Sequence, residues 1–344
     1  MGSIGCQVCP CNARGPASVA AATTPTTSAT PTSVEGSKTV KNVPYQWKSV
    51  TILGGGFVSG IIFSPIAKDL IYARTDVGGA YRYDPSNASW IPLTDMFPRD
   101  TNFLGIESIA PDPVDANKVY MAVGTYVQSW AGNGAILRST DKGATWKKTD
   151  MPIKMGGNEY GRSNGERLAI DPHQTNILFF GSRKSGLWKS TDGAVSWNKV
   201  ESFPVGTDAA GIGIVFVLFD AKSGATGKAT PHLYAGVAKN DGGLYESNDG
   251  GATWKLVPKQ PTGVMPGHGA FDSNGVLYLS YMNAPGPNDV TTGSIQAYNA
   301  KKSTWTNISP TAPSDSDKFG YGGLAVDAAH PGTLMVTTLD RWTK

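Results

Sequence analysis

The chain has 344 residues, with 42 glycines, 23 prolines, 17% charged residues and a formal net charge of +3. This composition favours a turn-rich, all-β protein and argues against a helical bundle or a coiled coil. The small net charge, without any run of Lys or Arg, excludes the basic surface that a nucleic-acid partner needs, and no apolar stretch approaches the ~18 residues of a membrane span.

Residues 1–44 differ from the rest of the chain. The Thr/Pro/Ser/Ala-rich run at 17–32 cannot bury apolar surface, so we expect a disordered tail and linker here. Cys6, Cys9 and Cys11 all precede this run, and neither they nor the scattered histidines make a complete zinc cluster, so no metal or other cofactor is expected. Linkers of this kind usually join secreted modules, so we expect an extracellular protein, although the sequence starts without the apolar core of a signal peptide.

From residue 45 onward the chain repeats a pattern of about fifty residues. Its signature, Ser-x-Asp-x-Gly-x-Thr/Ser-Trp, is an Asp-box; it occurs at 139–146, 190–197 and 247–254, and degenerate copies end at Trp90 and Trp305. In such a hairpin turn the Asp accepts hydrogen bonds from backbone N–H groups, Gly adopts a positive φ, and Trp packs between sheets. Each copy is therefore assigned a structural role rather than a catalytic one.

Short apolar runs divide each repeat into four expected strands. The second strand of each unit is expected to end near Tyr72, Tyr120, Phe179, Tyr234, Tyr278 or Met335. Four-stranded units at this period indicate a β-propeller. About five units are complete and a sixth stops partway at Lys344, and an open row of blades leaves exposed edges, so residues 45–344 are interpreted as a truncated propeller domain.

Antiparallel alternation sorts the loops of a propeller onto two faces. The turns between strands one and two share one face with the Asp-box turns. The longer loops between strands two and three share the other face with the blade connections, and function is expected on this loop face. An aromatic, polar groove with few charges suits a neutral polysaccharide, because sugar rings stack on aromatic faces and hydroxyls form hydrogen bonds. The candidate binding residues of the loop face are Tyr126, Trp130, Arg162, Arg183, Tyr281, Asn283, Arg341 and Trp342.

Asp76 is the carboxylate that we single out for chemistry. It stands at the end of an expected strand, and Gly78 and Gly79 follow it and are expected to leave space beside it. An Asp before two glycines is also a common turn former. On the pattern alone, both the catalytic and the turn-forming interpretation stay open.

Several segments resemble glycoside hydrolase family 74, the xyloglucanases. The likeness covers residues 45–344 and rests on the segments Tyr-Gln-Trp-Lys-Ser-Val at 45–50, 72–82 with its Thr-Asp-Val-Gly-Gly, 133–139, 165–171, 186–192 and 339–342. The resemblance implies two seven-bladed propellers that face each other across a cleft holding a xyloglucan chain, and hydrolysis of the β-1,4-glucan backbone with inversion. The Asp of the Thr-Asp-Val-Gly-Gly motif is the family's general base, which implies this role for Asp76.

The same resemblance implies that the general acid is an Asp of the second propeller. Inversion needs acid and base carboxyls ~6.5–9.5 Å apart, and the sequence ends before a second propeller begins. We therefore expect this chain alone to be inactive or nearly so, because general acid catalysis is worth ~10²–10⁴-fold. The sequence also departs from the family pattern at Thr343, where a second Trp often follows Trp342, and at Ala194, where an Asp-box usually has Gly.

Two other classes of function are open. A non-catalytic propeller would use its loop face to bind glycans without turnover, although the motif around Asp76 argues against it. A sialidase-like hydrolase also carries Asp-boxes, but it needs a cluster of arginines around a carboxylate and usually an early Phe-Arg-Ile-Pro motif, which is absent. The expected partner is xyloglucan or its oligosaccharides, bound by a monomer, with neither nucleic acid nor a membrane as partner.

Overall fold

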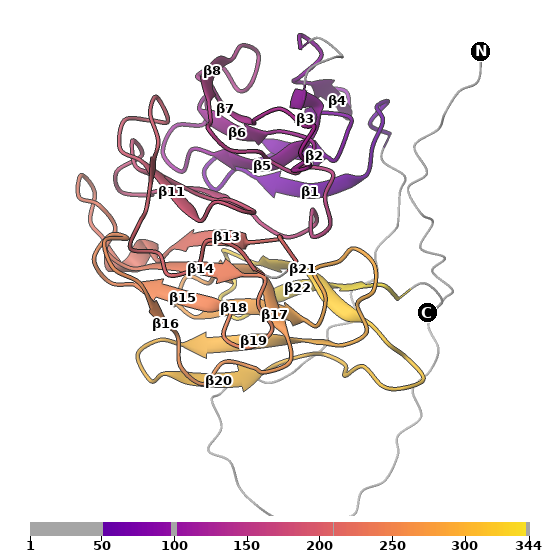
Figure 1. The fold of residues 1–344 in the computed structure, drawn as a ribbon, viewed down its shortest axis with the longest axis vertical. Coiled ribbons are helices and arrows are strands. Elements are labelled where there is room, and N and C mark those ends of the chain that lie inside the picture. Colours follow the sequence, from indigo (N-terminus) through magenta and orange to yellow (C-terminus); the bar gives the residue numbers. More distant parts are fainter. Residues whose placement is uncertain (1–50, 98–101, 209, 342–344) are drawn as a thin grey trace, which may run out of the picture.

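The computed structural model describes residues 51–97, 102–208 and 210–341 (Figure 1). The predicted tail and linker, the three cysteines, the first family segment and Trp342 lie outside the described residues. In the described part, regular structure consists of strands and two short 3-10 helices, η1 (Asn102–Leu104) and η2 (Ala221–Ser223). No helix there has the length and apolar character needed to cross a membrane.

The strands form five antiparallel four-stranded sheets and one two-stranded sheet, arranged as successive blades of a ring (Figure 1). Blade one contains β1 (Val58–Phe63), β2 (Ile71–Thr75), β3 (Ala80–Asp84) and β4 (Ser89–Pro92). Blade two contains β5 (Ile106–Pro111), β6 (Val119–Val123), β7 (Ala135–Ser139) and β8 (Lys147–Asp150). Blade three contains β9 (Leu168–Ile170), β10 (Leu178–Gly181), β11 (Leu187–Ser190) and β12 (Asn198–Lys199).

Blade four contains β13 (Ile214–Phe219), β14 (Leu233–Val237), β15 (Leu244–Ser247) and β16 (Lys255–Leu256). Blade five contains β17 (Met265–Phe271), β18 (Leu277–Met282), β19 (Gly293–Asn299) and β20 (Thr304–Asn307), and the sixth sheet pairs β21 (Gly320–Val326) with β22 (Leu334–Leu339). The prediction of an all-β propeller with five complete blades and part of a sixth is confirmed.

The expected ends of the second strands are wrong in a regular way. Each aromatic or Met residue chosen as an end is instead the second residue of its strand: Tyr72, Tyr120, Phe179, Tyr234, Tyr278 and Met335. The strands continue beyond these residues toward the loop face, because the residues that follow also pair with strands one and three.

The Asp-box turns have the predicted hydrogen bonds. In blade two, Asp141 accepts from the backbone N–H and the hydroxyl of Thr145, at 2.9 and 2.6 Å, and Ser139 donates to it at 2.6 Å. These bonds, that from Ser139 first, lower the pKa of Asp141 to about 2. Trp146 donates to the carbonyl of Leu93 in blade one at 3.0 Å, so the turn also joins neighbouring blades.

A second repeated turn was not anticipated from the sequence. An Asp directly after strand one caps the following turn through backbone N–H groups in blades two to six: Asp112, Asp171, Asp220, Asp272 and Asp327. In blade one, Ser64 takes this role. This Asp recurs once per blade from blade two onward, so its period is the sequence signal that could have revealed it.

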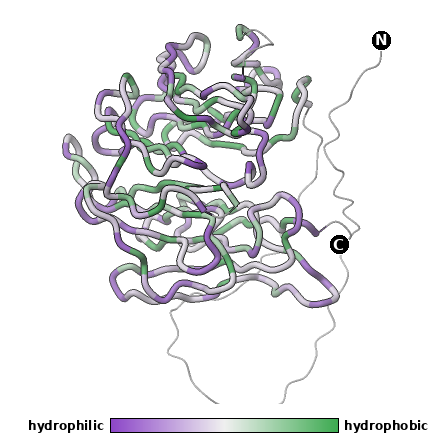
Figure 2. Tube along the Cα trace, viewed as in Figure 1, coloured by the Kyte–Doolittle hydropathy of each residue, from purple (hydrophilic) through white to green (hydrophobic). Residues whose placement is uncertain are grey.

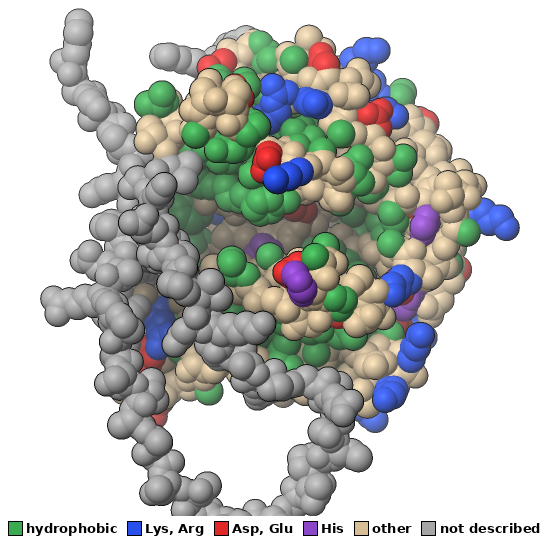
Figure 3. All heavy atoms as spheres, turned by 180° about the vertical axis from the view of Figure 1, so that it is seen from behind, with side chains coloured by type: hydrophobic (Ala, Val, Ile, Leu, Met, Phe, Trp, Pro, Cys, Tyr) green, Lys and Arg blue, Asp and Glu red, His purple; other side chains and the backbone are tan. Residues whose placement is uncertain are grey.

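The hydrophobic core lies between neighbouring blades. Leu70 and Tyr72 of blade one, for example, belong to one cluster with Ile109 and Val119 of blade two. Hydrophobic residues follow the strands, and hydrophilic residues concentrate in peripheral loops (Figure 2). Seen from behind, the molecule is hollowed at its centre, with apolar side chains around the hollow (Figure 3).

Candidate active site

Asp76 lies directly after β2, in the turn that leads to β3. Its Oδ1 accepts a hydrogen bond of 2.7 Å from the backbone N–H of Phe57, and its Oδ2 lies 3.2 Å from Nε of Arg162. The same turn meets the connection between blades one and two, because Gly79 donates to the carbonyl of Leu104 at 2.8 Å. Asp76 is therefore outside the sheet, on the loop face.

Gly78 and Gly79 do not leave open space beside Asp76, which corrects that expectation. A Cβ at Gly78 would lie 1.8 Å from the carbonyl oxygen of Gly55, and a Cβ at Gly79 would lie 1.9 Å from Oγ1 of Thr94. Gly79 also has a φ of +85°, in the left-handed region. The two glycines let other segments approach closely, and this close packing holds the Asp76 turn in place.

Arg162 reaches Asp76 from the long connection that joins blades two and three, at 151–167. Its backbone carbonyl accepts a hydrogen bond of 2.7 Å from Nη1 of Arg74, and Arg74 Nη2 donates to the carbonyl of Asn164 at 2.8 Å. Arg74 also forms an ion pair with Glu166, with Nε and Oε1 2.8 Å apart. Strand β2 thus leads directly into Asp76 and, through Arg74, also holds the segment that brings Arg162 to it.

Two β-bulges supply side chains to this region. Pairing skips Ser59 in β1 and Glu107 in β5, so each is an extra residue opposite its partner strand. Such a bulge redirects a side chain. Ser59 accepts a hydrogen bond of 2.9 Å from Nη1 of Arg74, and Glu107 forms ion pairs with Arg167 and Arg183.

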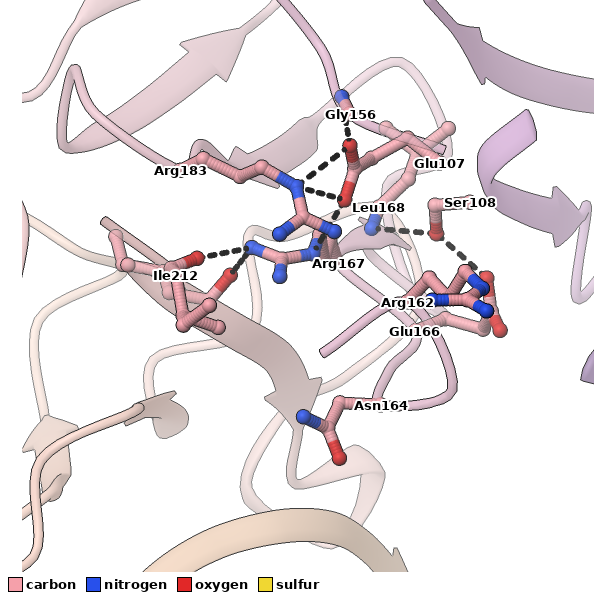
Figure 4. A network of polar contacts seen from close by, with 12 residues as sticks. Glu107, Ser108, Gly156, Arg162, Asn164, Glu166, Arg167, Leu168, Arg183 and Ile212 are labelled. Atoms are coloured by element: carbon pink, nitrogen blue, oxygen red, sulfur yellow. Dashed lines mark hydrogen bonds and ion pairs between the residues drawn. The ribbon is translucent and has the colours of Figure 1, made fainter. Parts of the chain in front are cut away.

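The Glu107 cluster is buried near the strand-one edges of blades two and three (Figure 4). Nε of Arg167 and of Arg183 lie 2.8 and 3.0 Å from Oε1 of Glu107. Burial by itself would raise the pKa of Glu107, but Arg183 and then Arg167 outweigh it and hold the pKa at about 2. Sequence reasoning missed Glu107, Arg167 and Arg74, although a charged residue inside an apolar strand is a signal for a buried pair.

An aromatic pair lies on the loop face beside the Asp76 turn. The ring centroids of Tyr126 and Trp130 are 5.1 Å apart, and Trp130 is 72% exposed. Asn158 donates to the hydroxyl of Tyr126 at 2.8 Å. Glu159, which sequence reasoning missed, accepts from the backbone N–H of Val127 at 3.0 Å.

This aromatic loop and the Asp76 turn meet at Gly105. A Cβ on that glycine would lie 2.5 Å from Cα of Thr125 and 3.0 Å from the carbonyl oxygen of Asp76. The aromatic pair and the carboxylate therefore share one continuous part of the loop face.

Burial argues against two of the predicted sugar contacts. Arg183 is 2% exposed, and its guanidinium is occupied by Glu107 and by the carbonyl of Tyr160, at 2.7 Å. Tyr281 is fully buried in β18, with its ring at 79° to that of Trp305. The sequence pattern placed both near the loop face, but their side chains turn inward, so neither presents its side chain to a ligand.

Two further predicted residues are partly exposed and bind other residues of the protein. Asn283 donates to Thr291 Oγ1 at 2.8 Å and accepts from its backbone N–H at 2.9 Å. Arg341 pairs with Asp317 and lies over the ring of Phe319, at 4.5 Å from its centroid. Of the predicted binding residues within the described ranges, Arg162 contacts Asp76 directly, and Tyr126 and Trp130 belong to the loop that packs against its turn.

On this face, one carboxylate can take part in proton transfer, and the neighbouring loop offers an aromatic surface on which a sugar ring can stack. No group of three or more His, Cys, Asp or Glu residues suited to a metal ion occurs in the described ranges. The site is thus built from Asp76, its two partners and the aromatic pair.

Proteins of similar sequence are xyloglucanases that are much longer than this chain. No family model matches the chain. A xyloglucanase from Paenibacillus is 53% identical over 316 residues, which cover 87% of this chain and 31% of the relative. An oligoxyloglucan-reducing end-specific xyloglucanase from Emericella nidulans is 41% identical over 355 residues, which cover 95% of this chain and 42% of the relative.

Solved structures give the same result. A family 74 xyloglucanase from Xanthomonas campestris matches with a TM-score of 0.79 and 47% identity, over 86% of this chain and 44% of that one. A family 74 enzyme from Niastella koreensis matches with a TM-score of 0.75 and 38% identity, over 83% of this chain and 41% of that one. The chain thus spans less than half the length of these relatives.

Blades built on Asp-box turns, with a carboxylate and an aromatic pair on the loop face, define an Asp-box β-propeller. The relatives identify it further. The chain belongs to glycoside hydrolase family 74.

Proposed function

We propose that the chain supplies the general base, Asp76, and part of the substrate-binding surface of a xyloglucan hydrolase. The observation that carries the proposal is the position of Asp76 on the loop face, where its turn packs through Gly105 against the loop that carries the Tyr126–Trp130 pair. Relatives that are 41–53% identical are named xyloglucanases, which supports the choice of substrate.

In this proposal, Asp76 takes a proton from a water molecule, whose oxygen attacks the anomeric carbon of the glucan backbone. The glycosidic C–O bond breaks as the new C–O bond forms, and the leaving oxygen takes a proton from a second carboxyl group. An inverting pair of this kind stands ~6.5–9.5 Å apart. We assign the acid to a part of the longer relatives that this chain does not match.

A substrate whose leaving group needs no proton tests the base separately from the acid. A chloro-nitrophenyl β-glycoside of a xyloglucan oligosaccharide releases a stable phenolate, so its hydrolysis depends on water activation. We expect release by the 344-residue chain and a loss of ~10²-fold or more in Asp76→Ala. Asp84→Ala changes an exposed turn carboxylate of blade one and is the matched control. Release that Asp76→Ala leaves unchanged would overturn the assignment of the base.

A glycan-binding role without turnover is the second candidate. Both oxygens of Asp76 already have partners, Phe57 and Arg162, as they would in a structural turn. Binding of xyloglucan oligosaccharides without any phenolate release would favour this role. A sialidase-like role is disfavoured, because Arg167 and Arg183 are 1–2% exposed and cannot receive the carboxylate of a ligand.

We also propose an extracellular location. Xyloglucan is a polymer and cannot cross a membrane, so an enzyme for it must meet it outside the cell. Secretion of the full-length protein in its native host, measured in the culture medium, tests this part of the proposal.

A further inference from the structure

We propose that Arg162 is a positioning residue for Asp76 and not a sugar-binding residue. Together with Phe57 it holds the two carboxylate oxygens in one orientation. The importance of this orientation for catalysis rests on the proposed function of Asp76 as the general base. The orientation itself can be measured independently.

Phe57 and Arg162 contact opposite oxygens of the same carboxylate. The Phe57 N–H donates to Oδ1 at 2.7 Å, whereas Arg162 Nε lies 3.2 Å from Oδ2. Arg162 Cζ lies 5.2 Å from the centroid of the Phe57 ring, within the range of a cation–π contact. The three residues therefore all contact one another, and Phe57 touches both members of the ion pair.

This ion pair is better shielded from water than an ordinary surface pair. The side chains of Arg162 and Asp76 are 21% and 9% exposed. Arg162 Nε makes no aligned hydrogen bond, so the contact with Oδ2 is one of charge. Reduced contact with water strengthens this attraction, which is weak between fully exposed groups.

The backbone of Arg162 is held on both sides. Its carbonyl accepts from Arg74 Nη1 at 2.7 Å, and the preceding Gly161 donates to the carbonyl of Gly286 in blade five at 2.7 Å. Arg74 in turn pairs with Glu166, which accepts from Ser108 Oγ at 2.6 Å. Because Arg74 and Asp76 belong to the same stretch of chain, movement of this stretch shifts the base and the anchor of Arg162 together.

The pair matters because a general base must aim a lone pair at its water before the reaction begins. Without Arg162, Oδ2 loses its partner and the carboxylate can rotate about its last torsion angle. A broad torsion of this kind has no strong preference of its own. Arg162 thus acts through Asp76, and its loss should affect the chemical step more than substrate binding.

The first experiment measures kcat and KM for the aryl glycoside in Arg162→Ala and Arg162→Lys. We expect kcat of Arg162→Ala to fall ~10–100-fold with KM within about twofold, and Lys to restore part of the loss because it keeps the charge. Arg82→Ala removes an arginine of blade one that bonds to the Asp-box turn, and is the control. A raised KM with unchanged kcat would mean that Arg162 binds sugar, and would overturn the proposal.

The second experiment needs no turnover, so it separates this proposal from the proposed function. Hydrogen exchange of the Phe57 amide reports the bond to Asp76 Oδ1. We expect exchange ~10-fold faster in both Asp76→Ala and Arg162→Ala, and unchanged in Arg82→Ala. If the wild-type chain releases no phenolate but this pattern holds, the proposed function fails and the positioning role stands. Exchange in Arg162→Ala at the wild-type rate would overturn the positioning role.

Discussion

Arg74 and Glu166 form a partly buried ion pair across 92 residues of sequence, with Nε and Oε1 2.8 Å apart. Arg74 belongs to β2 of blade one, and Glu166 belongs to the connection that precedes blade three. Glu166 also accepts from the backbone N–H of Ile109 in blade two at 2.8 Å. One carboxylate thus ties blades one and two to the connection that also carries Arg162.

Loss of Arg74 should destabilise the fold strongly. Arg74→Leu leaves Glu166 without its charge partner and frees the carbonyls of Arg162 and Asn164, so we expect a loss of ~3–5 kcal/mol in the free energy of unfolding. Denaturant unfolding measures it. Lys118→Ala removes an exposed ion pair with Asp115 and should cost at most ~1 kcal/mol. Equal unfolding midpoints for the two variants would contradict this prediction.

The stability of blade four should fall at alkaline pH because of His232. Burial would lower the pKa of His232, but hydrogen bonds with Asp220 and Glu246 outweigh it and raise the pKa to about 9. Because the pKa of His232 is higher in the folded than in the unfolded state, its protonated form stabilises the folded protein. This stabilisation is fully present below the unfolded pKa of 6.5 and is lost as the pH rises through about 9. Unfolding midpoints measured between these pH values should decline more in the wild type than in His232→Gln. Parallel declines would refute the assignment.

Gly251 of the third Asp-box should not tolerate a side chain. A Cβ there would lie 2.5 Å from Cζ of Phe179, and φ is +84°. Gly227 has a similar φ of +81° but no heavy atom within 4 Å of its Cβ position. Gly251→Ala should therefore lower the free energy of unfolding by ~1–3 kcal/mol more than Gly227→Ala, because only the first adds overpacking. Thermal or denaturant unfolding of the two variants provides the comparison, and equal losses would exclude overpacking as the cause.

Trp130 should contribute to oligosaccharide affinity without contributing to stability. Covering ~50 Å² of its exposed ring with a sugar would supply ~1.3 kcal/mol, close to tenfold in affinity. Titration calorimetry with a xyloglucan oligosaccharide should show this loss in Trp130→Ala, with an unchanged unfolding midpoint. Met335→Ala changes another exposed apolar side chain, on β22, and should leave affinity unchanged. If Trp130→Ala binds the oligosaccharide with wild-type affinity, Trp130 is not part of the binding surface.

The architecture could be predicted because its signals are local and recur along the chain. A turn such as Ser139–Trp146 needs only its own side chains to close, so its pattern is readable in a few consecutive residues. The alternation of strands then places Asp76 on the loop face. Strand boundaries were less accurate, since Tyr72 and its counterparts begin the second strands instead of ending them.

The sequence by itself determined the number of blades, the face that carries Asp76 and the family resemblance, because these depend on period, alternation and motif. Only the tertiary structure decided which polar side chains point outward. Arg183 and Arg162 both lie in connections on the loop face, but Glu107 turns Arg183 inward, whereas Asp76 holds Arg162 at the surface. Such pairings join residues that are far apart in the chain. In the low-dielectric interior each buried charge needs a partner of opposite charge, and no local sequence pattern specifies which residue that partner is.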